Sequence, residues 1–425
     1  MKKTIKSEYL SRVEGEGGLA IEIVDGKIAR LQMKIFEAPR FFESFLIGRS
    51  YTDVPDFTSR ICGICPAAYL MSSVHPIEEI FEIEIDNSIR SLRRLLYASE
   101  WLSSHALHVY MLHGPDFYGI ESAWASRDYL DIAKRGLDFK KLGNKITSII
   151  GGRSVHPISV RIGGFYKLPD KGELKALILE LENAYENSLE GIKWASGLDF
   201  KDMASDMEYV SLRHPNEYPM NEGFVVSNEG IEMQMSRFFD SIQEYQVDYS
   251  TSLHAAIKRD NTLTPYLTGP ISRVNLNYDR LPPEISQIIK ECAINIPIKN
   301  IQMGIIARSI EISYAIHEAL RIIKSYEEPE MPCKDFSLQA GKATWITEAP
   351  RGMLIHHYEL DEKGIVQKCV IIPPTTQNLF HIEKTIYQFV QANLDSPVDY
   401  LKRECEKIIR SYDPCISCAT HVVIL

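Results

Sequence analysis

Four of the eight cysteines form two Cys-x-x-Cys pairs near opposite ends of the chain. Cys62 and Cys65 lie in the sequence RICGICP, and Cys415 and Cys418 lie in DPCISCATH. Two intervening residues allow both thiolates of a pair to face one point from a tight turn, so four thiolates can meet at one metal centre. A structural zinc is the commonest outcome of this spacing, and a redox disulfide or unrelated buried thiols are also compatible with it.

The separation of the two pairs argues against an ordinary zinc module. Such modules usually place their pairs about 15–20 residues apart, whereas here almost the whole chain lies between them. A site built from both pairs would lie in the middle of the protein and would draw its ligands from both ends of the sequence.

Composition narrows the class of protein further. The 425 residues are 45% hydrophobic and 24% charged, as in a soluble globular protein. With 47 basic and 57 acidic residues, the net charge of −10 argues against nucleic acid or an anionic membrane as the main partner. No apolar run approaches the ~18 residues of a membrane span. The N-terminal MKKTIKSE is followed by no apolar stretch, so we expect no secretory signal and a cytoplasmic location.

The elements that must position the cysteines are mainly helical. Residues 19–36 alternate loosely between apolar and polar types and predict a β-hairpin with a turn at Asp25-Gly26. No repeat or linker divides the sequence, so we expect one intertwined domain over residues 1–425, mainly α with small β-sheets (α+β). Apolar residues at helical spacing predict helices at 87–112, 174–195, 233–257, 283–292, 307–326, 383–394 and 398–411.

Further short motifs surround the cysteine pairs in a fixed order: RVEG at 12–15, EAPRFFE at 37–43, GGRSVHP at 151–157, EAPRG at 348–352 and PTTQN at 374–378. Together with the two cysteine motifs, they resemble the large, catalytic subunit of NiFe hydrogenases from residue 12 to residue 421. The sequence SHALH at 104–108 and the overall spacing are most similar to the soluble, cytoplasmic branch of that family, which is linked to NAD(P) or other carriers. The resemblance implies a helical-bundle body.

The resemblance implies a ligand set for the cysteines. Cys62 and Cys415 would be terminal nickel ligands, and Cys65 and Cys418 would bridge nickel to an iron that carries one CO and two cyanides. The expected activity is reversible, heterolytic oxidation of H2, or reduction of protons. Candidate bases for the released proton are Cys415, Arg351 and the neighbouring Asp413.

The remaining site residues follow from the same resemblance. Pro350, Arg351 and Thr375 are assigned to cofactor binding: Arg351 would reach over the open metal position and hydrogen-bond one cyanide, and Thr375 would hold the other. Asp116 would pair with Arg351 in a dry environment. Glu14 would relay protons outward, although a lone glutamate is usually a solvated surface group.

A second, hard cation is also implied. Glu43, His421 and the backbone carbonyl of Ile371 match its ligands. Oxygen ligands suit Mg2+, and the histidine leaves Fe2+ open.

For several other residues the structural interpretation comes first. His105 and His108 are expected to be packed core histidines, and His156 to be a turn histidine or a group beside a partner's iron–sulfur cluster. The cysteines outside the two pairs are expected to be small apolar core residues: Cys292, Cys333, Cys369 and Cys405.

Two positions depart from the family pattern. Tyr69 stands where the family usually has a histidine hydrogen-bonded towards the second N-terminal cysteine. Most members also carry an extension that is removed just after the histidine matching His421, whereas this sequence continues to Leu425. It is either cut later or needs no cut.

The cysteines outside the two pairs have no spacing suited to an iron–sulfur cluster, so electrons must leave through another chain. We expect an iron–sulfur small subunit, with flavin-bearing or further iron–sulfur (diaphorase-type) subunits that pass electrons to NAD(P), ferredoxin or a similar carrier. Two different functions also fit parts of the sequence: a non-catalytic relative similar to the quinone-site subunit of respiratory complex I, which lacks the thiolates, and a structural protein with a four-cysteine zinc site.

Overall fold

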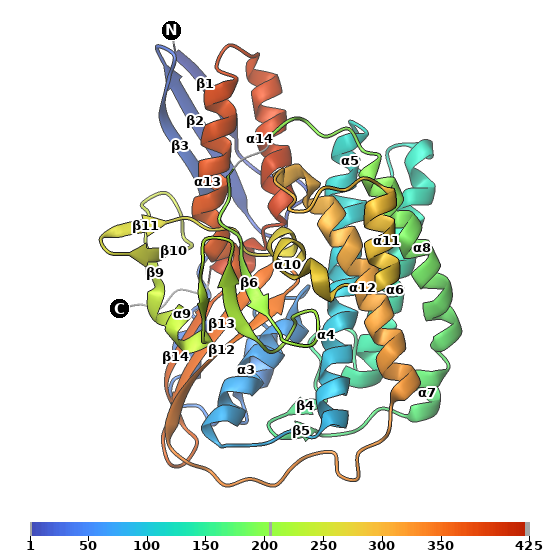
Figure 1. Cartoon of the computed structure of the whole chain (residues 1–425). Helices are drawn as coiled ribbons and strands as arrows, with labels where there is room; N and C mark the ends of the chain where they lie inside the picture. The colour runs from blue at the N-terminus through green and yellow to red at the C-terminus, as the bar shows by residue number, and fades with distance from the viewer. Residues whose placement is uncertain (1, 204–205, 421–425) are drawn as a thin grey trace.

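The computed structural model describes residues 2–203 and 206–420 of the chain. It is mainly helical with small antiparallel sheets, which confirms the predicted fold class. Figure 1 shows a helical body on one side and the sheets on the other. The helices are α1 Phe42–Leu46, α2 Val54–Ser59, α3 Pro66–Ile80, α4 Asn87–Leu107, α5 Gly114–Phe117, α6 Leu130–Gly151, α7 Lys171–Lys175, α8 Ile178–Ser196, α9 Met235–Ser241, α10 Pro270–Asn277, α11 Pro283–Glu291, α12 Gly304–Ser325, α13 Pro374–Ala392, α14 Val398–Tyr412 and α15 Ile416–Ala419.

The strands pair into small antiparallel sheets. β2 and β3 form the predicted hairpin, and positive φ angles at Asp25 and Gly26 allow its tight turn. β1 adds a third strand to this hairpin. The strands are β1 Lys2–Ser7, β2 Gly17–Val24, β3 Lys27–Ile35, β4 Val160–Arg161, β5 Gly164–Phe165, β6 Val210–Arg213, β7 Phe224–Ser227, β8 Glu232–Met233, β9 Ile242–Tyr245, β10 His254–Arg259, β11 Thr262–Thr264, β12 Gly341–Ala349, β13 Gly352–Leu360 and β14 Val366–Ile372.

Helix α4 is the centre of the helical body. It packs against α6 and α12, and α8 in turn packs against α12 (Figure 1). The predicted helix over 87–112 is confirmed as far as Leu107, after which His108–His113 forms a π-helical turn, η1. Such turns often occur at functional sites.

Two long helices, α3 and α6, lie outside the predicted helical segments. α6 contains Gly136 and Gly143, which lower helix propensity. Packing requires them, because a Cβ at Gly136 would lie 2.3 Å from the Cβ of Tyr110 and one at Gly143 would lie 2.6 Å from the carbonyl oxygen of Ser99. α3 contains Pro76, which argues against a continuous helix from sequence alone.

The predicted helix over 233–257 is wrong. Only Met235–Ser241 is helical. The chain then continues as β9 and β10, which pair with each other, and β10 also pairs with β11. β10 buries four successive residues, from His254 to Ile257, as expected of a strand covered on both faces. Tertiary pairing therefore outweighs the local helical spacing in this segment.

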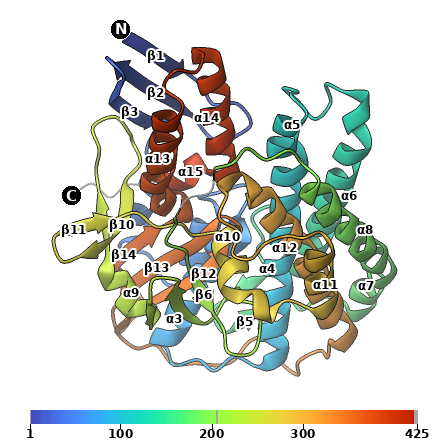
Figure 2. The same cartoon turned by 45° about the horizontal axis from the view of Figure 1, so that its top comes forward.

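The two ends of the chain lie side by side. The N-terminal strands run beside α13 and α14 in both views (Figures 1 and 2), and α14 packs against β1. The backbone N–H of Ile416 donates to the carbonyl of Glu14 at 3.0 Å, and that of Arg40 donates to Thr420 at 2.9 Å. The segments that carry the first and last motifs are thus in direct contact. Among the described residues, no helix is long and apolar enough to cross a bilayer.

Candidate metal centre

The four cysteines of the two pairs meet in the interior. Cys62 and Cys65 lie in the turn between α2 and α3. Cys415 lies in the turn after α14, and Cys418 lies in the short helix α15 that follows this turn. Their sulfur atoms all lie within 4.8 Å of one another. Across the two motifs, the sulfur atoms of Cys62 and Cys415 are 3.5 Å apart and those of Cys65 and Cys418 are 3.6 Å apart. The convergence that the motif spacing predicted is therefore present.

The backbone around Cys62 and Cys65 favours thiolates. The Cys62 sulfur accepts hydrogen bonds from the backbone N–H groups of Ile64 and Cys65, both at 3.2 Å. Cys65 is the N-cap of α3, and Pro66 begins the helix. A helix N-terminus carries partial positive charge, which stabilises a nearby thiolate.

Burial decides what the four sulfur atoms can bind. The four side chains are 1–3% exposed. Burial raises the pKa of Cys415, and its neighbouring thiols raise it further, so the four groups cannot all ionise unless positive charge is added. Sulfur donors select soft or borderline metals such as nickel, iron and zinc. The donor set therefore fits one or two such ions.

Arg351 supplies one positive charge beside the thiols. It lies in the turn between β12 and β13 and is 2% exposed. Its Nε donates to the carbonyl of Asp413 at 2.9 Å, and its Nη2 donates to the Asp413 carboxylate at 3.2 Å. Asp413 adopts the left-handed conformation (φ 56°) at the end of α14. Its backbone carbonyl and its carboxylate therefore both face the Arg351 guanidinium. The thiols and Asp413 hold the pKa of Arg351 above its usual value, although burial opposes this.

Glu14 connects the buried sulfur to the partly exposed surface. The Cys415 thiol donates to its Oε2 at 3.0 Å, and the backbone N–H of Ser417 donates to the same oxygen at 3.1 Å. The Ser417 hydroxyl donates to the other carboxylate oxygen. Glu14 is half-buried, unlike the fully buried Cys415. A carboxylate in this position can accept a proton from the thiol and release it outward.

Two further predicted residues lie close to the cysteines or to Arg351: Thr375 contacts the backbone of Cys415, and Pro350 directly precedes Arg351. Thr375 is the second residue of α13, after Pro374, and its hydroxyl accepts from the backbone N–H of Cys415 at 3.0 Å. Pro350 precedes Arg351 in the β12–β13 turn and is buried. Thr375 therefore lies beside Cys415, and Pro350 directly precedes Arg351; their assignment to cofactor binding stays a prediction.

The predicted pairing of Asp116 with Arg351 is wrong. The Asp116 carboxylate instead accepts from Arg12 at 2.5 Å and from Arg410 at 2.7 and 2.9 Å. Although burial opposes it, the hydrogen bonds from His113 and Arg410 hold the pKa of Asp116 well below its usual range. Arg351 instead contacts Asp413, and Asp116, in α5 directly after η1, contacts Arg410 of α14.

Two of the three predicted ligands of the second cation lie together. Glu43, on α1, is buried, and its Oε1 accepts from the backbone N–H of Ile371 at 2.5 Å. Burial raises the pKa of Glu43 to about 8. A cation bound beside this carboxyl would favour its ionised form. The third predicted ligand, His421, lies outside the described residues.

The core histidines have structural partners. His105 is fully buried, with Nε2 3.0 Å from Oε2 of Glu311, and the Nε2 of His108 is 2.7 Å from the carbonyl oxygen of Arg410. His156 lies in a turn with a positive φ, and its Nδ1 is 2.8 Å from the Ser59 carbonyl oxygen. These positions confirm that His105 and His108 are packed in the core and that His156 is a turn residue.

The other predicted structural residues divide in two. Cys369 and Cys405 are buried, as predicted, whereas Cys292 and Cys333 are only half-buried. The Tyr69 ring packs edge-on against His356, and its hydroxyl is buried without a hydrogen-bond partner among the described residues. Tyr69 therefore fills the family's histidine position without a hydrogen bond to sulfur in the described part of the chain.

Glu100 was not predicted from the sequence as a residue of the site. This carboxylate, on α4, is buried and accepts from the backbone N–H groups of Ala67 and Ala68 at 2.6 and 2.9 Å, at the start of α3. Burial raises its pKa to about 8. Its only sequence signal is a single acidic residue in an otherwise apolar part of the helix. Two buried arginines were not predicted either: Arg273 holds the backbone directly before Arg351, and Arg308 holds the backbone directly before Asp413.

Comparison with known proteins agrees with this geometry. Residues 40–134 and 260–421 match the model of the nickel-dependent hydrogenase family. The chain is 31% identical to sulfhydrogenase 2 subunit alpha of Pyrococcus furiosus, over 99% of this chain and 100% of that one. It is 29% identical to sulfhydrogenase 1 subunit alpha of the same organism, over 99% and 98% of the two chains.

Solved structures share the fold over the whole chain. A NAD+-reducing NiFe hydrogenase in its reduced state superposes with a TM-score of 0.87 at 22% identity, covering 99% of both chains. The Ni-Fe-Se hydrogenase of Desulfovibrio vulgaris Hildenborough superposes with a TM-score of 0.80 at 20% identity, covering 99% and 100%. The chain belongs to the nickel-dependent hydrogenase family. Within it, the chain is a large, catalytic subunit of the NiFe type, an oxidoreductase that acts on H2.

Proposed function

We propose that this subunit interconverts H2 with protons and electrons at a nickel–iron group held by Cys62, Cys65, Cys415 and Cys418. The observation that carries the proposal is the meeting of four buried thiols from both ends of the chain within 4.8 Å. In the proposed arrangement, Cys62 and Cys415 would be terminal nickel ligands, and Cys65 and Cys418 would hold nickel together with an iron that would carry one CO and two cyanides. When bound, this group supplies the redox-active metals at which H2 is cleaved heterolytically.

The side chains around the cysteines divide the remaining work. Cys415 gives a proton to Glu14, which lies 3.0 Å from its sulfur and is half-buried. Arg351, fixed by Asp413, presents a charged guanidinium in a dry environment, where hydrogen bonds to an anionic group are strong. With Pro350 beside it, Arg351 would bind one cyanide, and the Thr375 hydroxyl would bind the other.

A second cation near the C-terminus completes the proposed cofactor set. Glu43, the carbonyl of Ile371 and His421 would hold Mg2+ or Fe2+. The raised pKa of Glu43, about 8, supports a need for positive charge there.

Electrons are proposed to leave through a partner chain. In residues 2–203 and 206–420, the four cysteines are the one group of His, Cys, Asp and Glu residues placed to hold a metal, and a route for electrons needs further centres. We propose an iron–sulfur small subunit and diaphorase-type subunits that reduce NAD(P), ferredoxin or a similar carrier in the cytoplasm. The NAD+-reducing enzyme with the same fold supports this choice. The purified chain with intact metals would then reduce a soluble carrier more slowly than its complex, and equal rates would refute the need for a partner.

Metal analysis and infrared spectroscopy of the purified protein test the centre. We expect one nickel and one iron in the cysteine site, with CO and cyanide bands, because these ligands absorb where proteins do not. One zinc without nickel would instead support the structural zinc protein. A relative of the complex I quinone-site subunit would lack the thiolates, so the four converged cysteines disfavour that function.

Cys415→Ser should abolish nickel incorporation, because a hydroxyl is a poor ligand for a metal that prefers sulfur. Cys292→Ser is the matched control, since Cys292 is a half-buried single cysteine outside the site. Nickel content, measured in both variants, decides the matter. Nickel retained in Cys415→Ser at the wild-type level would remove this residue from the ligand set.

Arg351→Lys should keep both metals and lower H2 turnover by about 10²–10³-fold, the usual effect of losing one preorganised donor. Lysine keeps the charge but loses the planar fork that contacts Asp413 twice. Turnover and metal content are measured together. Full turnover in the variant would show that Arg351 is only structural.

A further inference from the structure

The turn that carries Arg351 rests on a buried segment that sequence analysis did not single out. This support segment, residues 268–273, runs from Thr268 into the first turn of α10 and ends at Arg273. Thr268 and Arg273 are 2% and 0% exposed, respectively. The two residues contact the backbone on opposite sides of Arg351.

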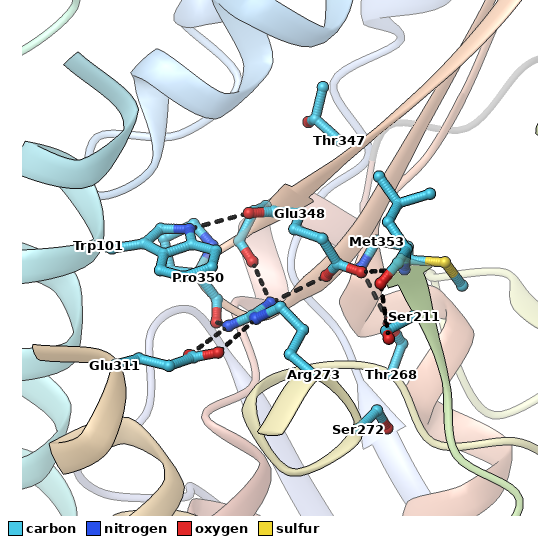
Figure 3. A network of polar contacts seen from close by, with 12 residues as sticks. Trp101, Ser211, Thr268, Ser272, Arg273, Glu311, Thr347, Glu348, Pro350 and Met353 are labelled. Atoms are coloured by element: carbon cyan, nitrogen blue, oxygen red, sulfur yellow. Dashed lines mark hydrogen bonds and ion pairs between the residues drawn. The ribbon is translucent and has the colours of Figure 1, made fainter. Parts of the chain in front are cut away.

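Arg273 holds the backbone immediately before Arg351. Its Nη2 donates to the carbonyl of Pro350, and its Nη1 donates to the carbonyl of Ala349, both at 2.9 Å (Figure 3). These are the last two carbonyls before Arg351. A guanidinium offers several N–H groups in one rigid plane, so it can hold two successive carbonyls and carboxylates at once.

Buried acidic partners fix the Arg273 side chain itself. Its Nε and Nη2 donate to the two oxygens of Glu311 at 2.7 and 2.6 Å, and Nη1 donates to Glu348 at 3.0 Å. The guanidinium also lies 4.4 Å from the ring centroid of Trp101 (Figure 3). Glu311 and Glu348 are both fully buried. All three guanidinium nitrogens of Arg273 thus donate hydrogen bonds. Because the guanidinium is fixed, the Pro350 carbonyl that it binds is fixed as well.

Thr268 holds the backbone after Arg351. Its hydroxyl accepts from the backbone N–H of Met353 at 2.9 Å. The intervening Gly352 has a φ of +134°, and a Cβ there would lie 2.7 Å from the Thr268 side chain and 2.9 Å from the Gly269 nitrogen. The support segment and the turn are therefore in contact at backbone distance, which only glycine permits.

The other anchor of Arg351 is held in a similar way. Arg308, on α12, donates to the carbonyls of Ser411 and Tyr412, each at 3.0 Å, directly before Asp413. Arg308 and Glu311 lie three residues apart on α12, so one helix holds Asp413 through Arg308 and the Arg351 turn through Glu311 and Arg273. α12 therefore sets the two ends of the Arg351–Asp413 pair relative to each other.

We propose that Arg273 and Thr268 are positioning residues that fix the Arg351 guanidinium relative to the four cysteines. They act through Arg351 and need not touch the metals or H2. The inference rests on the role proposed above for Arg351. It adds that the planar, multidentate contact of Arg273 with the Pro350 and Ala349 carbonyls is required for turnover, whereas its charge alone is insufficient.

Arg273→Lys in the assembled, metal-loaded enzyme tests the proposal. We expect nickel and iron to stay at wild-type levels, turnover to fall at least tenfold and KM for H2 to stay within twofold. The cyanide infrared bands should move in the same direction as in Arg351→Lys. Because Arg273 acts through Arg351, the double variant Arg273→Lys/Arg351→Lys should lose no more turnover than Arg351→Lys alone.

Arg93→Lys is the matched control. Like Arg273, Arg93 is buried: it is 2% exposed. It makes two 2.7 Å bonds to a buried carboxylate, Glu78, and donates to the carbonyls of Arg161 and Gly164. It lies outside the contacts of the metal centre, so it should lose thermal stability without moving the infrared bands. If Arg273→Lys behaves as Arg93→Lys does, or if the double variant loses the product of the two single losses, the proposal is overturned.

The outcome for Arg351→Lys separates this inference from the proposed function. If that variant changes neither turnover nor infrared bands, the role of Arg351 fails and the inference fails with it. If it changes both while Arg273→Lys changes neither, the inference fails alone.

Thr268→Val gives a second test should Arg273→Lys fail to accumulate. Valine keeps the shape but removes the acceptor for the Met353 N–H, and the backbone bonds of Thr268 with Asn378 remain. We expect a smaller displacement of the cyanide bands in the same direction and a turnover loss of about threefold or more. Unchanged bands and turnover in this variant would overturn the proposal.

Discussion

At the scale of single residues, the contact between Cys415 and Glu14 decides how a proton can leave the centre. The Cys415 thiol is buried, whereas Glu14, in the segment between β1 and β2, is half-buried. Ser417 donates to Glu14 from both its backbone N–H and its hydroxyl, which fixes the carboxylate in one orientation. Ser417 thus holds the Glu14 carboxylate in place, and this half-buried carboxylate can take a proton from Cys415 and pass it towards the surface.

Glu14→Gln should lower H2 turnover by about 10²-fold or more, the usual share of a positioned acid or base, while nickel and iron content stay unchanged. The amide keeps the shape and one acceptor oxygen but cannot take a proton from Cys415. Turnover and metal content report the two effects separately. Glu16→Gln, an exposed acidic residue two positions away, serves as the control and should retain full activity. Comparable turnover in the two variants would contradict the relay role.

Sequence motifs located residues well where they lie next to a cysteine or in a short turn. Glu14, Arg351, Thr375 and Asp413 all come to the centre in the structure. Asp116 was assigned to the wrong partner, because a motif does not say which of several buried arginines a carboxylate meets. Three other residues were missed for a related reason: Glu100, Arg273 and Arg308. Each contacts, across the core, the backbone beside a cysteine, Arg351 or Asp413, and the sequence of its own helix indicates only that the residue is buried.

At the scale of elements, periodicity predicted several helices whose apolar residues recur at helical spacing, and it failed where packing against neighbouring elements decides the structure. α4, α11, α12 and α14 lie close to their predicted ranges. α6 was missed because it approaches η1 through Gly136 and α4 through Gly143, and glycine argues against a helix in a sequence. β9 and β10 were assigned to a helix because their strand pairing depends on partners that local spacing does not reveal.

The contact between α4 and α12 contains a buried ion-pair cluster whose strength depends on pH. Glu318 accepts from Arg94 and, at 2.8 Å twice, from Arg321. Burial alone would raise the pKa of Glu318, but the two arginines outweigh it and lower the pKa to about 2, from 4.5 in an unfolded chain. The folded pKa lies below the unfolded one. The stabilisation is therefore complete above pH 4.5 and is lost as the pH falls from 4.5 towards 2.

Glu318→Gln should therefore lower the free energy of unfolding at pH 7 by up to ~3 kcal/mol, since each pKa unit corresponds to about 1.4 kcal/mol. The difference from the wild type should stay constant down to about pH 4.5 and shrink below it. Denaturant unfolding of both purified proteins from pH 7 to pH 3 measures this difference.

Glu182→Gln is the control for Glu318→Gln. Glu182 pairs with Lys324 of the same helix α12, but both side chains are about half exposed, so the cost should stay below ~1 kcal/mol. A pH-independent difference between wild type and Glu318→Gln would contradict the prediction, because it would show that the pKa of the Glu318 carboxyl is the same in the folded and the unfolded protein.

At the scale of the whole molecule, the metal site joins the two ends of the chain. The cysteines that meet, Cys62 with Cys415 and Cys65 with Cys418, lie 353 residues apart in sequence. Glu14 also pairs with Cys415 in an isolated β-bridge. Two cysteine pairs could be expected to converge because four thiolates complete one centre, but no local pattern indicates which elements bring them there. We propose that residues 1–425 behave as one intertwined unit, since the first and last segments complete each other's hydrogen bonds.

Metal loading should accordingly stabilise both ends of the chain together. A ligand that binds only the folded state adds stability by mass action, and here its ligands come from both segments. We expect hydrogen exchange to slow on loading with nickel and iron in the backbone around Glu14, in the turn from Cys62 to Cys65 and in α15, while exchange in the outer helix α8 stays unchanged. The midpoint of thermal unfolding should rise by several degrees, as about 2–4 °C per kcal/mol is usual for large domains. Cys415→Ser, treated in the same way, should show neither effect. Protection gained at only one end of the chain would contradict a shared centre, because thiolates that hold the same metals cannot be stabilised on one side alone.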